Sequence, residues 1–84
     1  MKKILITGGA GYIGSILATE LIQLGHKVTV VDLLKYSTTA LNHLYNSKNF
    51  EFVHADVTNK GIMKKLISKN EYIIPLAGLV GAPL

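Results

Sequence analysis

The stretch TGGAGYIG, residues 7–14, decides the fold of this 84-residue chain. It follows the apolar run Ile4–Ile6 and precedes apolar residues at helical spacing between Ile16 and Leu24. A strand, a glycine-rich turn and a helix therefore stand in that order, and in this context a glycine motif indicates a dinucleotide site. The glycines fit two overlapping patterns, Gly-x-Gly-x-x-Gly from residue 9 and Gly-x-x-Gly-x-x-Gly from residue 8.

Each glycine of the turn has its own physical reason. Gly8 or Gly9 supplies the positive φ that a strand needs to turn sharply into a helix. The missing Cβ of Gly11 lets the backbone approach a pyrophosphate, and Gly14 lets the helix lie close to the strand. The free N–H groups and the dipole of the first helical turn then favour an anion at this end.

The composition is that of one small packed domain. Apolar residues make up 49% of the chain, which favours a globular core over disorder. Cysteine is absent, so disulfides and thiolate metal sites are excluded. His26, His43 and His54 show no metal-ligand spacing, and we expect the first two at the surface and the third at a strand end. No metal site is predicted.

Charge and hydropathy limit the partners. The net charge of +4 comes from nine scattered lysines without arginine, which is typical of a solvated surface and not of a nucleic-acid interface. The apolar run near the N-terminus is too short for a signal peptide, and no segment is long enough to span a membrane. We therefore expect a cytoplasmic protein with no nucleic-acid or membrane partner.

Strands and helices alternate along the rest of the chain. Strands are expected at residues 3–7, 27–31, 50–54 and 71–76, and helices at 11–24 and 38–46. Gly25 ends the first helix, and Thr58 is expected to cap a third helix whose apolar stripe runs from Ile62 to Ile67. Repeated right-handed strand-helix-strand units predict an α/β fold of Rossmann type: a parallel sheet in the strand order 3-2-1-4 with helices on both faces.

Asp32 stands eighteen residues beyond Gly14, at the carboxyl end of the second strand. An acidic residue there can accept hydrogen bonds from the adenosine ribose hydroxyls, and it would repel a 2′-phosphate, so NAD is favoured over NADP. Lys35 could partly offset that repulsion. Taken alone, Asp32 could instead cap a loop, and the glycine turn upstream favours the ligand role.

With these residues the chain resembles the extended short-chain dehydrogenase/reductase family, the NAD-dependent nucleotide-sugar epimerases and dehydratases. TGGAGYIG matches the family's TGxxGxxG turn, and Asp32 matches its acidic residue after the second strand. The pair Asp56-Val57 matches the family's Asp-hydrophobic pair at the adenine. The segment Leu76-Ala77-Gly78 resembles the one that lines the nicotinamide-side ribose and pyrophosphate. The four matches stand in order along the whole chain.

The resemblance implies cofactor-binding roles and no catalytic role for residues of this chain. The pyrophosphate would be held by Gly8, Gly11, Tyr12, Ile13 and Gly14. The remaining contacts would come from Asp32 and Lys35 at the adenosine ribose, Asp56 and Val57 at the adenine, and Leu76, Ala77 and Gly78 under the cofactor. Each of these residues could instead have a purely structural role. Asp56 could be a turn residue, and Ile13 and Val57 could belong to the core. Tyr12 could cover the start of the helix, and Ala77-Gly78 could be an ordinary loop.

The resemblance also implies an enzyme that acts on a sugar nucleotide by transient hydride transfer and forms a homodimer at full length. The family's catalytic Ser or Thr follows a fifth strand, and its Tyr-x-x-x-Lys pair follows that. No tyrosine here has lysine four residues later. We therefore expect residues 1–84 to be the N-terminal part of one dinucleotide-binding domain, without catalytic or substrate-binding parts. Because its fourth strand is an apolar edge, we expect the isolated chain to be unstable or oligomeric in solution.

Two other functions fit the same residues. One is a non-catalytic dinucleotide-binding module. The other is a reductase or dehydrogenase of the same family that acts on a non-sugar substrate. The residues that would separate them from an epimerase or dehydratase are expected outside this stretch.

Overall fold

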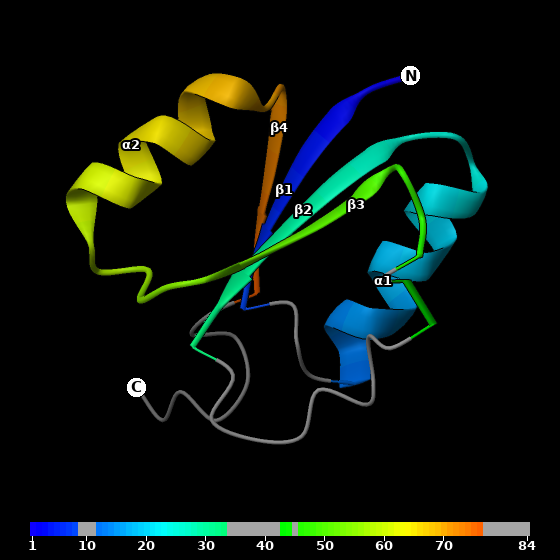
Figure 1. Cartoon of the computed structure of the whole chain (residues 1–84), viewed down its shortest axis with the longest axis horizontal. Coiled ribbons are helices and arrows are strands. Elements are labelled where there is room, and N and C mark those ends of the chain that lie inside the picture. Colours follow the sequence, from blue (N-terminus) through cyan, green and yellow to red (C-terminus); the bar gives the residue numbers. More distant parts are fainter. Residues whose placement is uncertain (9–11, 34–42, 45, 77–84) are drawn as a thin grey trace.

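A four-stranded parallel sheet with a helix on each face forms the framework of the chain (Figure 1). The structure is a computed structural model that describes residues 1–8, 12–33, 43–44 and 46–76, and for Tyr12 the backbone alone. Its elements are β1 (Lys3–Thr7), α1 (Tyr12–Gln23), β2 (Lys27–Asp32), β3 (Phe50–His54), α2 (Lys60–Lys69) and β4 (Tyr72–Pro75). The strand order is β3-β2-β1-β4, which confirms the predicted fold class.

The strand and helix boundaries lie close to those expected. β1 and β3 have the predicted ends, β2 extends by one residue to include Asp32, and β4 is one residue shorter at each end. Pro75 ends β4 opposite Thr7, and the ladder then resumes because the Leu76 N–H donates to the Thr7 carbonyl over 2.8 Å. The helix predicted at 38–46 falls largely outside the described residues.

Alternation along the strands divides the core into two layers. Ile4, Ile6, Val28 and Val30 are buried together with Ala18 of α1. Leu5 and Val31 point to the opposite face and are buried with Leu66 of α2. Because successive strand residues face opposite sides, α1 and α2 cover the two faces of the sheet (Figure 1).

The helix ends show one confirmed stop and one corrected cap. Gly25 has φ of +93° and donates to the Ile22 carbonyl, while the His26 N–H reaches the Leu21 carbonyl; together these bonds form a Schellman motif. The N-cap of α2 is Asn59 and not Thr58, so that prediction was wrong. The Asn59 side chain accepts from the Ile62 N–H over 3.1 Å.

Thr58 is displaced from the cap by the turn that precedes the helix. Its N–H donates to Asp56 Oδ1 over 2.9 Å, and the Asn59 N–H donates to the Asp56 carbonyl over 2.9 Å. Because Asp56 accepts both of these bonds, Thr58 belongs to the turn, and the N-cap of α2 lies one residue later than predicted, at Asn59. Within the described part of the chain, neither helix has the length and apolarity that a membrane crossing requires.

Candidate functional site

The carboxyl ends of all four strands lie along one edge of the sheet. In a parallel sheet this edge is where ligands bind, at the point where the order of the strands reverses. Here the reversal falls beside β1, since β2 and β4 flank it. The segments that follow the strands begin at Gly8, Leu33, Ala55 and Leu76.

The glycine turn begins as the sequence predicts. Gly8 has φ of +77°, in the left-handed region that favours glycine, and its N–H donates to the Val31 carbonyl over 2.8 Å. This bond ties the start of the turn to β2, one residue before Asp32. Gly9 and Gly11 lie outside the described residues.

The start of α1 offers an end that can receive an anion. The helix begins at Tyr12 and carries no acidic side chain in its first turn, so no carboxylate of that turn competes with an anion for its N–H groups. Ile13 is 57% exposed, and it is therefore not a core residue, which removes the structural alternative for that position. Gly14 is buried within the helix, as close packing on the sheet requires.

Asp32 lies at the end of β2, the strand next to β1. It is half-buried, and its carbonyl accepts from the Ala55 N–H over 3.1 Å. Its register partner on β3 is His54. The sheet thus places Asp32 beside the strand that leads into the glycine turn. Lys35 lies outside the described residues.

The two later matches differ in what the structure shows of them. Asp56 is exposed, and its carboxylate accepts a hydrogen bond from the Thr58 N–H in the turn before α2. Val57 beside it is 36% exposed and is therefore not a core residue. The turn role of Asp56 is therefore observed, and it leaves the carboxylate at the same edge as Asp32. Leu76 is half-buried and packs against the core layer on the α1 face. Ala77 and Gly78 lie outside the described residues.

His54 is a polar residue of this edge whose role the sequence analysis missed. Its ring Nε2 hydrogen-bonds with the carbonyl of Leu33, the residue directly after Asp32. His54 ends the third strand as Asp32 ends the second, which indicates that the two residues lie close together, but the bond to Leu33 depends on the register of the two strands.

The other histidines lie elsewhere. His43 is exposed, as expected, and its Nε2 lies 2.7 Å from the Thr19 hydroxyl. His26 is partly exposed, and its Nδ1 accepts from the Lys2 N–H over 3.1 Å. Among the residues that the structure describes, no three His, Asp or Glu side chains gather as metal ligands would.

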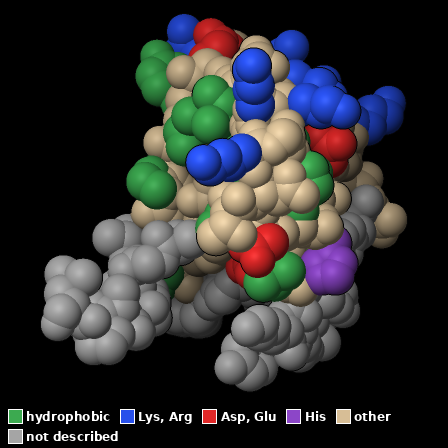
Figure 2. All heavy atoms as spheres, turned by 90° about the vertical axis from the view of Figure 1, so that its left-hand side faces the viewer, with side chains coloured by type: hydrophobic (Ala, Val, Ile, Leu, Met, Phe, Trp, Pro, Cys, Tyr) green, Lys and Arg blue, Asp and Glu red, His purple; other side chains and the backbone are tan. Residues whose placement is uncertain are grey.

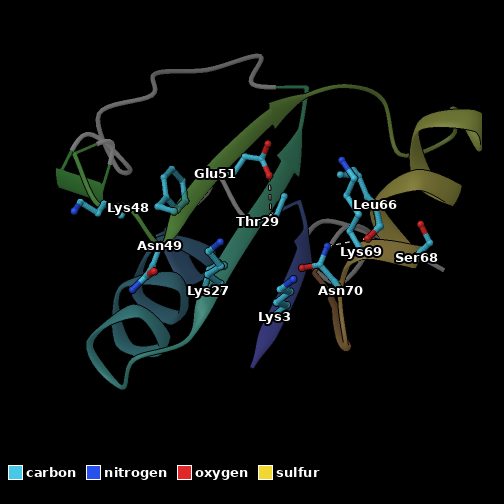
Figure 3. A pocket seen from close by; sticks show the side chains of 12 residues that line it. Lys3, Lys27, Thr29, Lys48, Asn49, Glu51, Leu66, Ser68, Lys69 and Asn70 are labelled. Carbon is cyan, nitrogen blue, oxygen red and sulfur yellow. Dashed lines mark hydrogen bonds between the residues drawn. The ribbon is translucent and has the colours of Figure 1, made fainter. Parts of the chain in front are cut away.

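A hollow of about 500 Å³ opens at the opposite edge of the sheet, on the α2 face (Figure 3). Its wall includes four lysines that are far apart in the sequence: Lys3, Lys27, Lys48 and Lys69. Lysine side chains also gather over the upper part of this face in Figure 2. Two hydrogen bonds lie within the wall: Thr29 donates to Glu51 over 3.4 Å, and Asn70 donates to the Leu66 carbonyl over 2.8 Å. Because Lys3 and Lys27 stand at the amino ends of β1 and β2, the hollow is separate from the candidate dinucleotide site at the carboxyl ends.

The sequence as a whole matches a known family. The model of the NAD dependent epimerase/dehydratase family matches residues 4–84. The chain belongs to this family. The resemblance drawn from the glycine turn, Asp32, Asp56-Val57 and the segment from Leu76 is thereby confirmed.

Relatives of this epimerase/dehydratase chain carry out different reactions. A UDP-N-acetyl-alpha-D-glucosaminuronate decarboxylase from Bacillus cytotoxicus is 38% identical over 80 residues, which are 95% of this chain and 25% of that protein. The chain spans 20–25% of the length of the curated relatives it matches.

Solved structures of the family share the fold. A UDP-glucose 4-epimerase from Thermotoga maritima, determined with UDP-glucose, has a TM-score of 0.74 and 35% identity over 88% of this chain and 23% of that one. A dTDP-glucose 4,6-dehydratase from Bacillus anthracis, in complex with NAD, has a TM-score of 0.81 and 27% identity over 90% of this chain and 26% of that one. The epimerase/dehydratase chain thus has the α/β sheet of its relatives.

Proposed function

We propose that this chain is the N-terminal part of a single dinucleotide-binding domain and that it holds NAD at the carboxyl edge of its sheet. One observation carries the proposal. Gly8, with φ of +77°, is hydrogen-bonded to Val31, and this bond puts the start of the glycine turn beside the strand that ends in Asp32. A pyrophosphate on the start of α1 and a ribose at Asp32 would then be neighbouring groups of one ligand.

The individual residues would divide the cofactor between them. The turn and the first residues of α1 would bind the pyrophosphate, with Gly8, Gly11, Tyr12, Ile13 and Gly14 as the candidates. Asp32, with Lys35 near the rim, would bind the adenosine ribose, and Asp56 with Val57 would flank the adenine. The segment Leu76, Ala77 and Gly78 would pass under the nicotinamide side.

Asp32 would also select the dinucleotide. A carboxylate can accept several hydrogen bonds, so it can bind ribose hydroxyls in addition to protein donors. The same charge repels a 2′-phosphate, which disfavours NADP. The NAD complex of the related dehydratase supports this choice of cofactor.

The protein that carries this chain would be a nucleotide-sugar epimerase or dehydratase. Bound NAD supplies reversible hydride acceptance, which allows a sugar carbon to be oxidised and reduced again. The residues of this chain would bind and orient the cofactor, and other parts would bind the sugar. The relatives support this division, because a decarboxylase and an epimerase share this portion of the chain.

Calorimetry with NAD and NADP on the full-length protein tests the site. Asp32→Ala should weaken NAD binding by roughly tenfold, because hydrogen bonds to a charged group are lost, and should strengthen NADP binding. Glu51→Ala is the matched control: it removes a carboxylate from the neighbouring strand, beside the hollow, and should change neither affinity. Gly11→Val should abolish both, since a branched side chain would fill the pyrophosphate's place. Unchanged NAD affinity in Gly11→Val would refute the site.

Turnover of sugar nucleotides tests the reaction class. The full-length protein should convert a UDP- or dTDP-hexose to its epimer or its dehydrated keto sugar without net consumption of NAD. Binding of NAD without turnover of any such sugar would favour a non-catalytic module. Net reduction of NAD by a non-sugar alcohol would favour a dehydrogenase.

A further inference from the structure

The end of β2 is held from both of its neighbouring strands. On the β1 side, the Gly8 N–H donates to the Val31 carbonyl over 2.8 Å. On the β3 side, the Ala55 N–H donates to the Asp32 carbonyl over 3.1 Å. These bonds are main-chain contacts at the end of the ladder, and the contact beyond them comes from a side chain.

That side chain is His54, whose ring Nε2 hydrogen-bonds with the Leu33 carbonyl. A carbonyl oxygen only accepts, so the histidine Nε2 must carry the proton and donate. Two consecutive carbonyls are therefore bound: that of Asp32 by Ala55, directly after β3, and that of Leu33 by His54, the last residue of β3. The peptide unit that follows Leu33 is thus held by His54 at a point where the ladder itself has ended.

Holding that peptide keeps the end of β2, where Asp32 stands, from fraying. The carboxylate stands on a backbone that is bonded before it, at its own carbonyl and after it. Asp32 is also half-buried, which limits the rotamers its side chain can adopt. Without the His54 bond, the bond from Ala55 to the Asp32 carbonyl would be the last contact on this side, and fraying of the strand end would let Asp32 and its carboxylate leave their place.

We propose that His54 is a positioning residue that holds Asp32 where it distinguishes NAD from NADP; this role rests on the proposed dinucleotide site. A ribose with two free hydroxyls gains most from a carboxylate fixed in one place, because both hydrogen bonds then form together without ordering cost. The same fixed charge repels a 2′-phosphate most strongly, which weakens NADP binding. A carboxylate that can move away from the ribose binds NAD more weakly and also repels the 2′-phosphate of NADP less.

Three variants of the full-length protein test this role by calorimetry with NAD and NADP. His54→Leu removes the donor and should narrow the NAD-to-NADP affinity ratio by roughly tenfold, mainly through weaker NAD binding. His54→Gln places an amide N–H at a similar reach and should restore most of the ratio. His26→Leu is the control, because it removes a histidine bonded to the backbone at the opposite edge of the sheet, and its ratio should equal that of the wild type.

The outcomes separate this role from the site on which it rests. A wild-type protein that binds neither dinucleotide would refute the proposed function and this role with it. Wild-type binding with an unchanged ratio in His54→Leu, or equal narrowing in the leucine and glutamine variants, would refute the role of His54 alone.

A measurement on the unaltered protein keeps the proposal testable if the leucine variant does not fold. Histidine ¹⁵N spectra of the free protein report which ring nitrogen carries the proton. The His54 ring should be protonated at Nε2. A neutral ring protonated at Nδ1 alone could not donate to Leu33, and it would overturn the proposal.

Discussion

Replacing Gly25 by alanine should destabilise the chain, because the backbone alone opposes the change. Gly25 has φ of +93°, and a Cβ built on it meets nothing within 4 Å. Neighbouring atoms therefore contribute no clash. An L-residue in the left-handed region costs about 1–2 kcal/mol, and restricting the unfolded chain returns about 0.4–1 kcal/mol. The expected net loss in the free energy of unfolding is about 1 kcal/mol.

Gly61 provides the matched control, since the same substitution there should have the opposite sign. Gly61 lies in the first turn of α2 without a positive φ, and its added Cβ would lie 3.6 Å from Asn59 Oδ1, an ordinary contact. Alanine should stabilise that helix by about 0.5 kcal/mol, because glycine is a poor helix former.

Thermal unfolding followed by circular dichroism measures both effects. A change of 1 kcal/mol shifts the Tm of a domain of this size by about 4–8 °C. The chain should be kept at a concentration where ultracentrifugation shows a monomer. Gly25→Ala should lower the Tm by a few degrees and Gly61→Ala should raise it. Shifts of the same sign in both variants would refute the conformational argument.

Three further predictions concern the core, the cap of α2 and the edge of the sheet. In a urea titration, Leu5→Ala should lower the free energy of unfolding by about 2–5 kcal/mol, because Leu5 is fully buried. Leu24→Ala, at a 72% exposed position, should lower it by less than about 0.5 kcal/mol. Asn59→Ala should lower the free energy of unfolding by about 1 kcal/mol through loss of the cap. Thr58→Ala should lower it less, and the reverse order would favour Thr58 as the cap. Ile73→Lys should reduce self-association of this chain in size-exclusion chromatography, since Ile73 is 42% exposed on an edge strand. An unchanged elution volume at high concentration would contradict that role for β4.

Local patterns in the sequence were enough to predict the sheet and most of its element boundaries. The run KVTVV and the alternation around it are typical of a strand wherever they occur, and Gly25 ends a helix through its own backbone freedom. Once strands and helices alternate, the right-handed rule for parallel connections leaves few strand orders. The positive φ at Gly8 followed from the same kind of reasoning, because a strand must turn sharply there to enter a helix.

Contacts between distant segments could be decided only by the tertiary structure. The hydrogen bond from His54 to Leu33 depends on the register of β3 against β2, and the spacing of residues in the chain does not specify it. Asn59 replaced Thr58 as the cap because Asp56 closes the preceding turn. The lysines of the hollow, scattered along the sequence, meet because the amino ends of three strands and the last turn of α2 converge. Residue types and their period thus determined which segments form the sheet, and packing decided which side chains meet at its two edges.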